Sequence, residues 1–250
     1  MDYWVSETDN GQSHAINKGW KIATGDIYAW LNSDDLLVPG TLFNVARIWI
    51  KNQNIGFIHG KADVINKSGV TKNKTYGAHF DLVESLLSSK NTVAQCTTFI
   101  SKSALDIVGF LDTNFHLSMD WDLWLRISSL FDSIFIPEIL SKFRVWDLSK
   151  TSTAWKKAEE EHVRIVKKFF CQKNIPIECM KLRRRAISSA YAREAVIAYR
   201  SKESSRFRKA MLHALIYDPT LRISEGRRLL PIFLLGRNIY SASKNLISRI

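Results

Sequence analysis

The stretch Ala29–Gly40, AWLNSDDLLVPG, runs from an apolar segment directly into two adjacent carboxylates, Asp34 and Asp35, and then into a Pro-Gly turn. Polar residues that follow a buried strand lie at the carboxyl edge of a sheet, where open α/β folds bind ligands. One Asp at the start of a helix near Pro39 would be an ordinary helix cap. Two adjacent carboxylates raise each other's pKa unless a cation lies between them, and a divalent ion with a bound diphosphate would supply that charge.

The segments around this stretch alternate in character, which predicts an α/β fold. Short apolar runs with strand-like composition alternate with stretches of helical periodicity. The expected strands cover residues 25–32 and 55–66, and the expected helices cover residues 12–23, 39–52 and 80–89. The turn Asn66–Gly69, followed by VTKNKTYG, predicts a β-hairpin.

The C-terminal part differs in pattern and charge. Residues 154–170, 179–202 and 205–217 have helical periodicity and contain no glycine. Residues 1–150 carry 14 basic and 16 acidic side chains, whereas residues 151–250 carry 22 basic and 8 acidic ones. We therefore expect a first domain over residues 1–152 and a helical basic extension over residues 153–250.

Composition narrows the class of protein. A hydrophobic content of 46% in 250 residues is enough for a packed core. The three cysteines, Cys96, Cys171 and Cys179, are too few and too irregularly spaced for a disulfide framework or a zinc site, so we expect a reducing compartment. The N-terminal MDYWVSETDN lacks the pattern of a signal peptide, and the apolar run LLPIFLLG is shorter than the ~20 residues of a membrane-spanning helix.

An ordered set of motifs resembles family 2 glycosyltransferases with the GT-A fold, which use nucleotide-diphosphate sugars. The set consists of residues 9–42, 56–69, 95–112, 118–127 and 135–146. The resemblance implies a GT-A-like, Rossmann-like mixed sheet and a metal-dependent, inverting transfer of a sugar to an acceptor hydroxyl. The resemblance rests on the order and spacing of the motifs, because no single motif is specific to the family.

By this resemblance, Asp34 matches the last carboxylate of the family's DxD motif and is expected to bind Mg²⁺ or Mn²⁺. Asn32 stands where many members have the first Asp, and it still offers a carbonyl oxygen for weaker coordination. Ser33 is expected beside the nucleotide. Asp35 has two alternatives, a supporting role at the metal or the helix cap.

Asp120, in SMDWDLWLRI, matches the family's general base, which would take the proton from the acceptor hydroxyl. Met119 replaces the Glu that often precedes this Asp. A helix cap is the alternative for Asp120 and is the role that we favour for Asp122. Arg126 follows Asp122 by one helical turn and is expected to pair with it.

The donor side of the site includes Gly11, Gln12 and Lys18, which match a loop and helix near the nucleotide in the family. Ile16 replaces an Arg found in many members. Lys18 is expected either to lie beside a phosphate or to be an ordinary solvated lysine on the surface of a helix. His14 is expected to face solvent.

The acceptor side includes Gln95 and Trp121, and a core position is the alternative for Trp121. Arg144 is expected near the diphosphate, with a structural salt bridge as its alternative. Trp146 replaces a His in the family's Arg-x-His stretch. His59 is expected to be a packed or edge residue of a strand.

The sequence thus predicts a glycosyltransferase of polysaccharide biosynthesis, associated with the cytoplasmic face of a membrane. Its donor would be a nucleotide-diphosphate sugar and its acceptor a glycan or a lipid-linked hydroxyl. The basic extension favours an anionic membrane surface as partner, with a solvated helical face as the alternative, and no nucleic acid is expected. Two rival functions remain open, a degenerate sugar- or nucleotide-binding module and a metal-dependent phosphoesterase.

The resemblance also implies strands that precede YWVSETDN in the family and grip the nucleotide. Only Met1 and Asp2 precede Tyr3 in this chain. We therefore expect an N-terminally truncated GT-A domain that is poorly active or inactive by itself. Two explanations are open: a start codon assigned too far downstream or a split gene, and a fragment that is completed by a further polypeptide.

Overall fold

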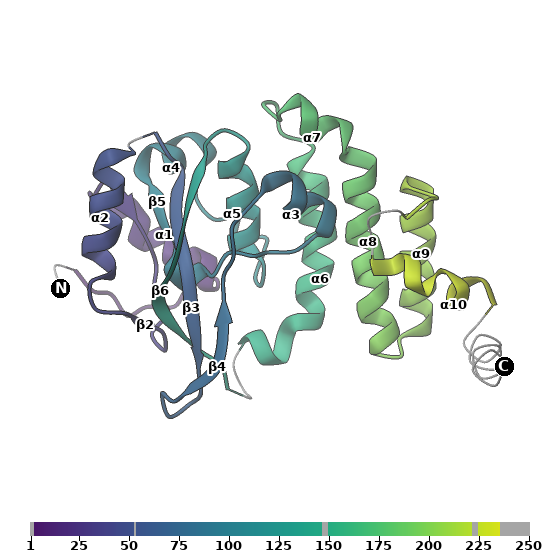
Figure 1. Cartoon of the computed structure of the whole chain (residues 1–250), viewed down its shortest axis with the longest axis horizontal. Coiled ribbons are helices and arrows are strands. Elements are labelled where there is room, and N and C mark those ends of the chain that lie inside the picture. The colour runs from purple at the N-terminus through teal and green to yellow at the C-terminus, as the bar shows by residue number, and fades with distance from the viewer. Residues whose placement is uncertain (1–2, 53, 147–149, 222–224, 236–250) are drawn as a thin grey trace. The chain divides into compact units, whose positions relative to one another are not determined.

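The computed structural model describes residues 3–52, 54–146, 150–221 and 225–235 of the chain (Figure 1). The chain divides into two compact units. The first contains Met1–Leu82 and Asn91–Ala158, and the second contains Val83–Lys90 and Glu159–Ile250. The domain limits of 1–152 and 153–250 stay a prediction, and no feature of the sequence indicates that the short segment 83–90 joins the second unit.

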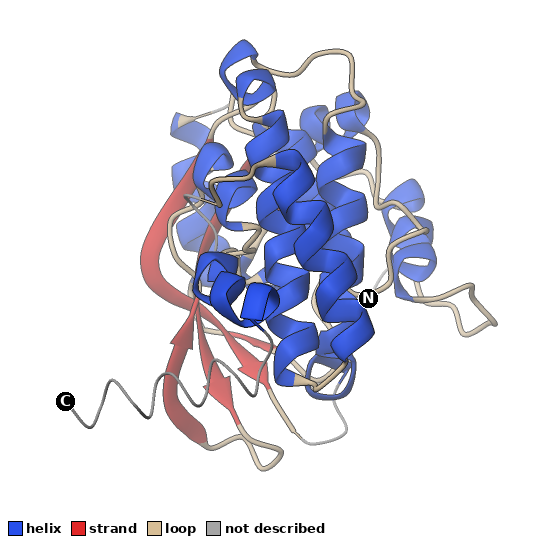
Figure 2. Ribbon diagram, turned by 90° about the vertical axis from the view of Figure 1, so that its right-hand side faces the viewer, coloured by secondary structure: helices blue, strands red, loops and turns tan. Residues whose placement is uncertain are grey.

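A six-stranded mixed sheet forms the centre of the first unit (Figures 1 and 2). The strand order is β1-β5-β3-β6-β2, with β4 paired to β3. The long central pair β3·β6 is parallel, and the other pairs among the described strands are antiparallel. The bounds are Ile27–Tyr28 for β1, Leu36–Leu37 for β2, Phe57–Ile65 for β3, Thr71–Tyr76 for β4, Phe99–Ser101 for β5 and Ser133–Arg144 for β6.

Helices pack on this sheet, and α1 and α2 begin close to where the periodicity predicts. The helices of this unit are α1 (Gln12–Ile22), α2 (Thr41–Lys51), α4 (Lys102–Val108) and α5 (Met119–Ser128), with the short 3-10 helix η1 at Gln95–Thr97. Neighbouring residues of a strand point to opposite faces. Ile58 of β3 accordingly packs with Val45 of α2, whereas Phe57 packs against Trp124 of α5, with ring centroids 5.1 Å apart.

The predicted strand over residues 25–32 is confirmed only for Ile27–Tyr28. After Tyr28 the backbone bonds to side chains instead of a neighbouring strand. The Trp20 indole donates to Ala29 O at 3.3 Å, and the Gln95 amide donates to Trp30 O at 2.8 Å. Both donors lie outside the predicted strand, so local periodicity could not reveal them. The hairpin predicted at Asn66–Gly69 is confirmed by the antiparallel pair β3·β4.

The register between β3 and β6 shifts at Gly60. Gly60 pairs with Ile136 and Ala62 pairs with Ser141, so two steps along β3 face five steps along β6. A side chain at Gly60 would lie 2.6 Å from Leu140 Cδ1 and 3.1 Å from Glu138 O. Glycine is therefore required for the close approach of the bulged strand.

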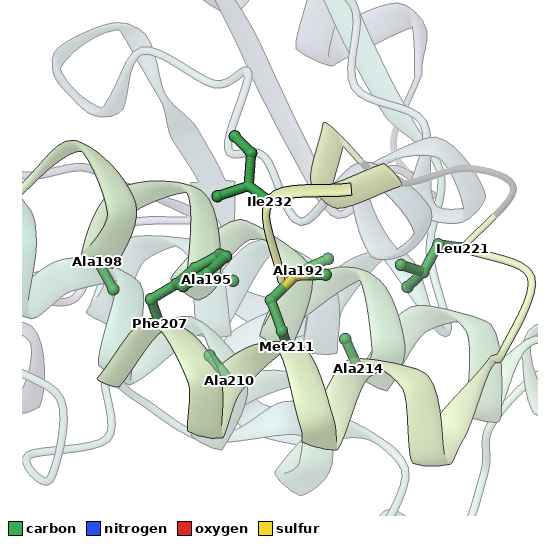
Figure 3. Close-up of a cluster of buried hydrophobic side chains, with 9 residues drawn as sticks. All are labelled: Ala192, Ala195, Ala198, Phe207, Ala210, Met211, Ala214, Leu221 and Ile232. Carbon is green, nitrogen blue, oxygen red and sulfur yellow. The ribbon is translucent and has the colours of Figure 1, made fainter. Parts of the chain in front are cut away.

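The second unit is helical, as the sequence predicts for the extension. Its described elements are α3 (Leu82–Ser88), α7 (Ile177–Lys181), α8 (Arg183–Arg200), α9 (Ser204–Tyr217), η2 (Glu225–Leu229) and α10 (Leu230–Leu235), and α6 (Lys150–Phe169) enters it at Glu159. Alanines let α8 and α9 approach closely. Figure 3 shows Ala192, Ala195 and Ala198 of α8 gathered with Phe207 and Met211 of α9. No described helix is long and apolar enough to cross a membrane.

Asp122 and Arg126 form a buried ion pair on α5, with Arg126 Nε donating to Asp122 Oδ2 at 2.9 Å. The same guanidinium donates to the carbonyls of Val108, Gly109 and Phe110 where α4 ends. The predicted pairing is confirmed. Asp122 lies in the first turn of α5, as predicted, but it is not the cap: Ser118 is the N-cap, and the Asp122 carboxylate bonds Arg126, whose guanidinium joins α5 to the end of α4.

Replacing Asp122 by Asn should destabilise the protein strongly, because it leaves the buried Arg126 charge without its partner. Loss of one partner of a buried pair costs about 3–5 kcal/mol, against about 0–1 kcal/mol for an exposed pair. The chain offers a matched control in Lys102–Asp106, which has the same spacing but is exposed. We expect Asp122→Asn to lower the free energy of unfolding in urea far more than Asp106→Asn. Equal losses would contradict the structural role of the buried pair.

Candidate functional site

Asn32 lies at the centre of a hydrogen-bond network below the turn formed by residues 32–35, which we call the acidic turn. Its side-chain oxygen accepts from Gln12 Nε2 at 2.8 Å. Its amide nitrogen donates to Asp35 Oδ2 at 3.1 Å and to Gln95 Oε1 at 3.2 Å. Three segments of the chain therefore meet on this one side chain. Because the amide donates to two acceptors, a carboxylate at this position would leave both of them unsatisfied.

Asp35 is a buried member of this network, with 4% of its surface exposed. Its Oδ1 accepts from the backbone N–H of Arg144 at 2.9 Å, and its Oδ2 accepts from Asn32. Burial raises the pKa of the Asp35 carboxyl above its ordinary value, and these two hydrogen bonds oppose that shift. The helix-cap alternative for Asp35 is wrong: α2 starts after Gly40, and no side chain caps it.

Arg144 fixes the backbone of the acidic turn from the other side. Its Nε donates to Asp34 O at 2.8 Å, and its Nη1 donates to Asn66 O and Lys67 O, each at 2.9 Å. The guanidinium thus joins the acidic turn to the tip of the β3–β4 hairpin. The salt bridge that was the alternative for Arg144 is not seen: among the described residues its guanidinium bonds carbonyl oxygens and forms no ion pair.

Asp34 differs from its neighbours because its carboxylate is exposed and, among the residues that the structure describes, has no hydrogen-bond or ion-pair partner. Ser33 beside it is also exposed. Within the described residues no three His, Cys, Asp or Glu side chains form a ready cation site. Any metal at Asp34 would therefore need oxygen ligands from a bound substrate, as Mg²⁺ commonly has from phosphates.

Asp120 lies in the first turn of α5 and is half-buried. Its Oδ2 accepts from Asn91 Nδ2 at 2.9 Å, and its Oδ1 accepts from the backbone N–H of Trp121 at 2.8 Å. Asn91 lies in the loop that leads into η1 and Gln95 is the first residue of η1, so this short segment contacts Asp120 at one end and Asn32 at the other. The structure thereby connects the two predicted acidic sites.

On the donor side, Gly11 precedes α1 with a φ of 103°, a conformation that favours glycine. Gln12, the next residue, joins the site through Asn32. Lys18 pairs with Glu7 at 2.6 Å, and both side chains are partly exposed. Lys18 is thus committed to a carboxylate in this structure, and its phosphate role stays a prediction.

Two aromatic candidates are fully buried. Trp121 has no exposed surface, which corresponds to its core alternative, so we do not include it in the proposed acceptor site. His59 is packed between Phe57 and Phe135, as expected for a packed strand residue. Neither of its ring nitrogens has a described hydrogen-bond partner. Burial lowers the pKa of His59 to about 4, so the ring is neutral at pH 7.

Sequence reasoning missed Asn91, Lys67 and the bonding role of Trp30 O. Asn91 contacts Asp120 across 29 residues, and Gln95 contacts Trp30 O across 65. Contacts over such separations leave no local periodicity. The only signal for Lys67 was its place in the turn sequence NKSG.

Comparison with known proteins supports the resemblance that the motifs carry. Residues 3–109 match the model of glycosyl transferase family 2, which confirms that resemblance for this segment. An uncharacterized glycosyltransferase of Rickettsia typhi is 30% identical over 173 residues, which cover 63% of this chain and 51% of that protein. The chain spans about half the length, or less, of the curated relatives it matches.

Two solved structures share the fold. S. aureus TarS 1-349 in complex with UDP-GlcNAc has a TM-score of 0.63 at 12% identity, over 94% of this chain and 70% of that one. The mannosyltransferase PcManGT from Pyrobaculum calidifontis, in complex with GDP-Man and Mn²⁺, has a TM-score of 0.51 at 16% identity, over 96% and 68%. At these identities the likeness shows the fold alone, and the predicted GT-A-like mixed α/β fold with a helical extension is confirmed.

Replacing Asn32 by Asp should destabilise the protein more at pH 7 than at pH 4. The new carboxylate would face the buried Asp35, so the folded-state pKa of both acids would rise above their unfolded values. An acid with a raised folded-state pKa loses stability as the pH rises above its unfolded pKa. Loss of the two donated bonds adds about 1–3 kcal/mol. Urea unfolding at both pH values measures the difference.

Ser33→Asp is the matched control, because it adds the same charge to the exposed side of the same turn. We expect it to change the free energy of unfolding by only about 0.5 kcal/mol. A loss for Asn32→Asp that is equal at both pH values would contradict the position of Asn32 between two acceptors.

Proposed function

We propose that the chain, whose residues 3–109 match the model of glycosyl transferase family 2, transfers a sugar from a nucleotide-diphosphate donor to a hydroxyl of a glycan or lipid-linked acceptor. One observation carries the proposal. Asn32, Asp35 and Arg144 hold the acidic turn from beneath, while the Asp34 carboxylate stays exposed and unbonded. A rigid turn with one free carboxylate suits a ligand that binds there repeatedly in the same geometry.

We propose that Asp34 binds Mg²⁺ or Mn²⁺ together with the donor diphosphate. The single free carboxylate fits a metal that takes its other ligands from phosphate oxygens and water. When bound, the metal would stabilise the negative charge of the departing diphosphate. Asp35 and Asn32 are then positioning residues rather than ligands, because the oxygens of both accept hydrogen bonds within the protein.

Asp120 is the proposed general base. It takes the proton of the acceptor hydroxyl as that oxygen forms a bond to the anomeric carbon, while the bond from that carbon to the diphosphate oxygen breaks. A single displacement of this kind inverts the anomeric configuration. The contact from Asn91 orients the carboxylate at Oδ2. Gln95 lies on the same short segment and is the proposed contact on the acceptor side.

Two substitutions should separate donor binding from proton transfer. Asp34→Asn should abolish the Mn²⁺-dependent part of donor binding, because the proposed metal ligand loses its charge. Asp120→Asn should keep donor affinity and lower the rate of transfer about 10²–10⁴-fold, the usual contribution of a general base. Calorimetry with UDP-GlcNAc and GDP-mannose, with Mn²⁺ or EDTA, measures binding, and product analysis measures transfer.

Asp26→Asn is the control, because Asp26 is an exposed carboxylate outside the proposed site. Unchanged Mn²⁺-dependent binding by Asp34→Asn would refute the metal assignment. Hydrolysis of the donor to sugar 1-phosphate and nucleoside monophosphate by the unaltered protein, at the same rate without an acceptor, would favour the phosphoesterase alternative. Donor binding with neither transfer nor hydrolysis would favour a binding module.

We further propose that the helical unit contacts an anionic membrane surface. Arg183 and Arg185 at the start of α8 are exposed, whereas Arg184 between them donates to the carbonyls of Ile216 and Tyr217. Each exposed cation near such a surface contributes about 1 kcal/mol.

Replacing Arg183 and Arg185 together by Gln should weaken binding to phosphatidylserine-containing vesicles, measured by cosedimentation, by roughly thirtyfold, since two cations of about 1 kcal/mol each are lost. Binding of the unaltered chain should fall steeply with salt, because the Debye length shrinks from roughly 10 Å at 0.1 M to 3 Å at 1 M. Replacing the exposed Lys21 and Lys51 of the first unit by Gln is the control. Equal binding to neutral phosphatidylcholine vesicles would overturn the proposal.

A further inference from the structure

The tip of the β3–β4 hairpin is a rigid turn. Asn66 Oδ1 accepts from the backbone N–H groups of Ser68 and Val70 at 3.0 and 2.9 Å. The backbone closes the same turn through Gly69 N to Asn66 O at 3.0 Å, and Gly69 has a φ of 85°. An asparagine that bonds to its own turn in this way limits the freedom of the tip. Lys67 therefore extends from a fixed backbone position.

The hairpin tip lies next to the acidic turn because one guanidinium binds both. Arg144 donates to Asp34 O through Nε and to Lys67 O through Nη1, at 2.8 and 2.9 Å. Two further contacts fasten the hairpin to the chain after β6. Val145 N donates to Ile65 O at 2.9 Å, and Lys72 Nζ lies 3.4 Å from Val145 O. Asp34 and Lys67 are therefore neighbours, although they are 33 positions apart in the sequence.

The Lys67 ammonium is oriented but has no carboxylate partner. It lies over the Trp146 ring, 5.8 Å from the centroid, which is within the range of a cation–π contact. In the described part of the chain it makes no ion pair, and neither does Asp34, although the two residues are neighbours. A free cation and a free carboxylate on adjoining turns provide opposite charges at one edge of the sheet.

We infer that Lys67 is a binding residue for the diphosphate of the donor, an inference that rests on the proposed function of the acidic turn. A diphosphate that shares a metal with Asp34 still carries oxygens on its other side, and a lysine ammonium binds such oxygens as a point charge. Asn32 makes this contact more important, since a turn with one free carboxylate binds a metal less strongly than a turn with two. Lys67 then supplies positive charge that does not depend on the metal.

Lys67→Met tests the inference, because methionine keeps an unbranched apolar stem over Trp146 and removes only the charge. Affinity should be measured by calorimetry for UDP and GDP, and for uridine and guanosine, which lack the diphosphate. We expect Lys67→Met to weaken UDP and GDP binding about tenfold, or ~1.4 kcal/mol, and to leave the nucleosides unchanged. The loss should remain in EDTA, and Lys67→Arg should restore most of the affinity.

Lys51→Ala is the matched control, because Lys51 is an exposed lysine of the same unit at the far end of α2. It should leave all four affinities unchanged. Wild-type affinity for UDP and GDP in Lys67→Met would overturn the inference and leave the proposed function intact, and so would an equal loss for the nucleosides. If the unaltered protein binds neither nucleotide nor a nucleotide sugar, the proposed function falls, and this inference falls with it.

Discussion

The buried carboxylate of Asp35 is the constraint on which the proposed site depends. Removing a carboxylate from water is unfavourable unless donors surround it, and here the donors come from Asn32 and from the backbone of Arg144. The two hydrogen bonds to the Asp35 carboxylate therefore fix both Asn32 at the start of the turn and Arg144 at the end of β6. Arg144, once placed, bonds Asp34 O and the hairpin tip. The geometry of the exposed Asp34 carboxylate thus follows from the burial of its neighbour.

The two adjacent carboxylates consequently have different roles. Asp35 is held within the protein by hydrogen bonds, and Asp34 is left available to solvent and ligand. The same division appears on α5, where Asp122 is buried against Arg126 and Asp120 is only half-buried. In each pair one carboxylate supports the backbone that presents the other. Asn91 and Gln95, on one short segment, connect the two pairs.

The parts of the fold that the sequence could predict are those specified by nearby residues. Helices α1, α2 and α9 and the hairpin after β3 follow from periodicity and turn composition. The pairing of Asp122 with Arg126 was predictable from its spacing of four residues, but its burial was not. For Asp35 the helix cap was one of two expected roles because the helix is the nearest element, whereas one of its two donors, the backbone N–H of Arg144, is 109 residues away. The strand after Gly25 was overestimated for a similar reason, since distant side chains satisfy its backbone.

Because the register shifts at Gly60, the two central strands contain different numbers of residues between the same paired positions. Between paired positions β6 contains three residues more than β3, which corresponds to roughly 10 Å of extended chain. Without these three extra residues in β6, Arg144 would lie beyond the end of β3 instead of opposite Ile65. An odd number of extra residues also exchanges the faces to which the following side chains point. The missing side chain at Gly60 thus determines, from a distance, both where the guanidinium of Arg144 lies and which way it points.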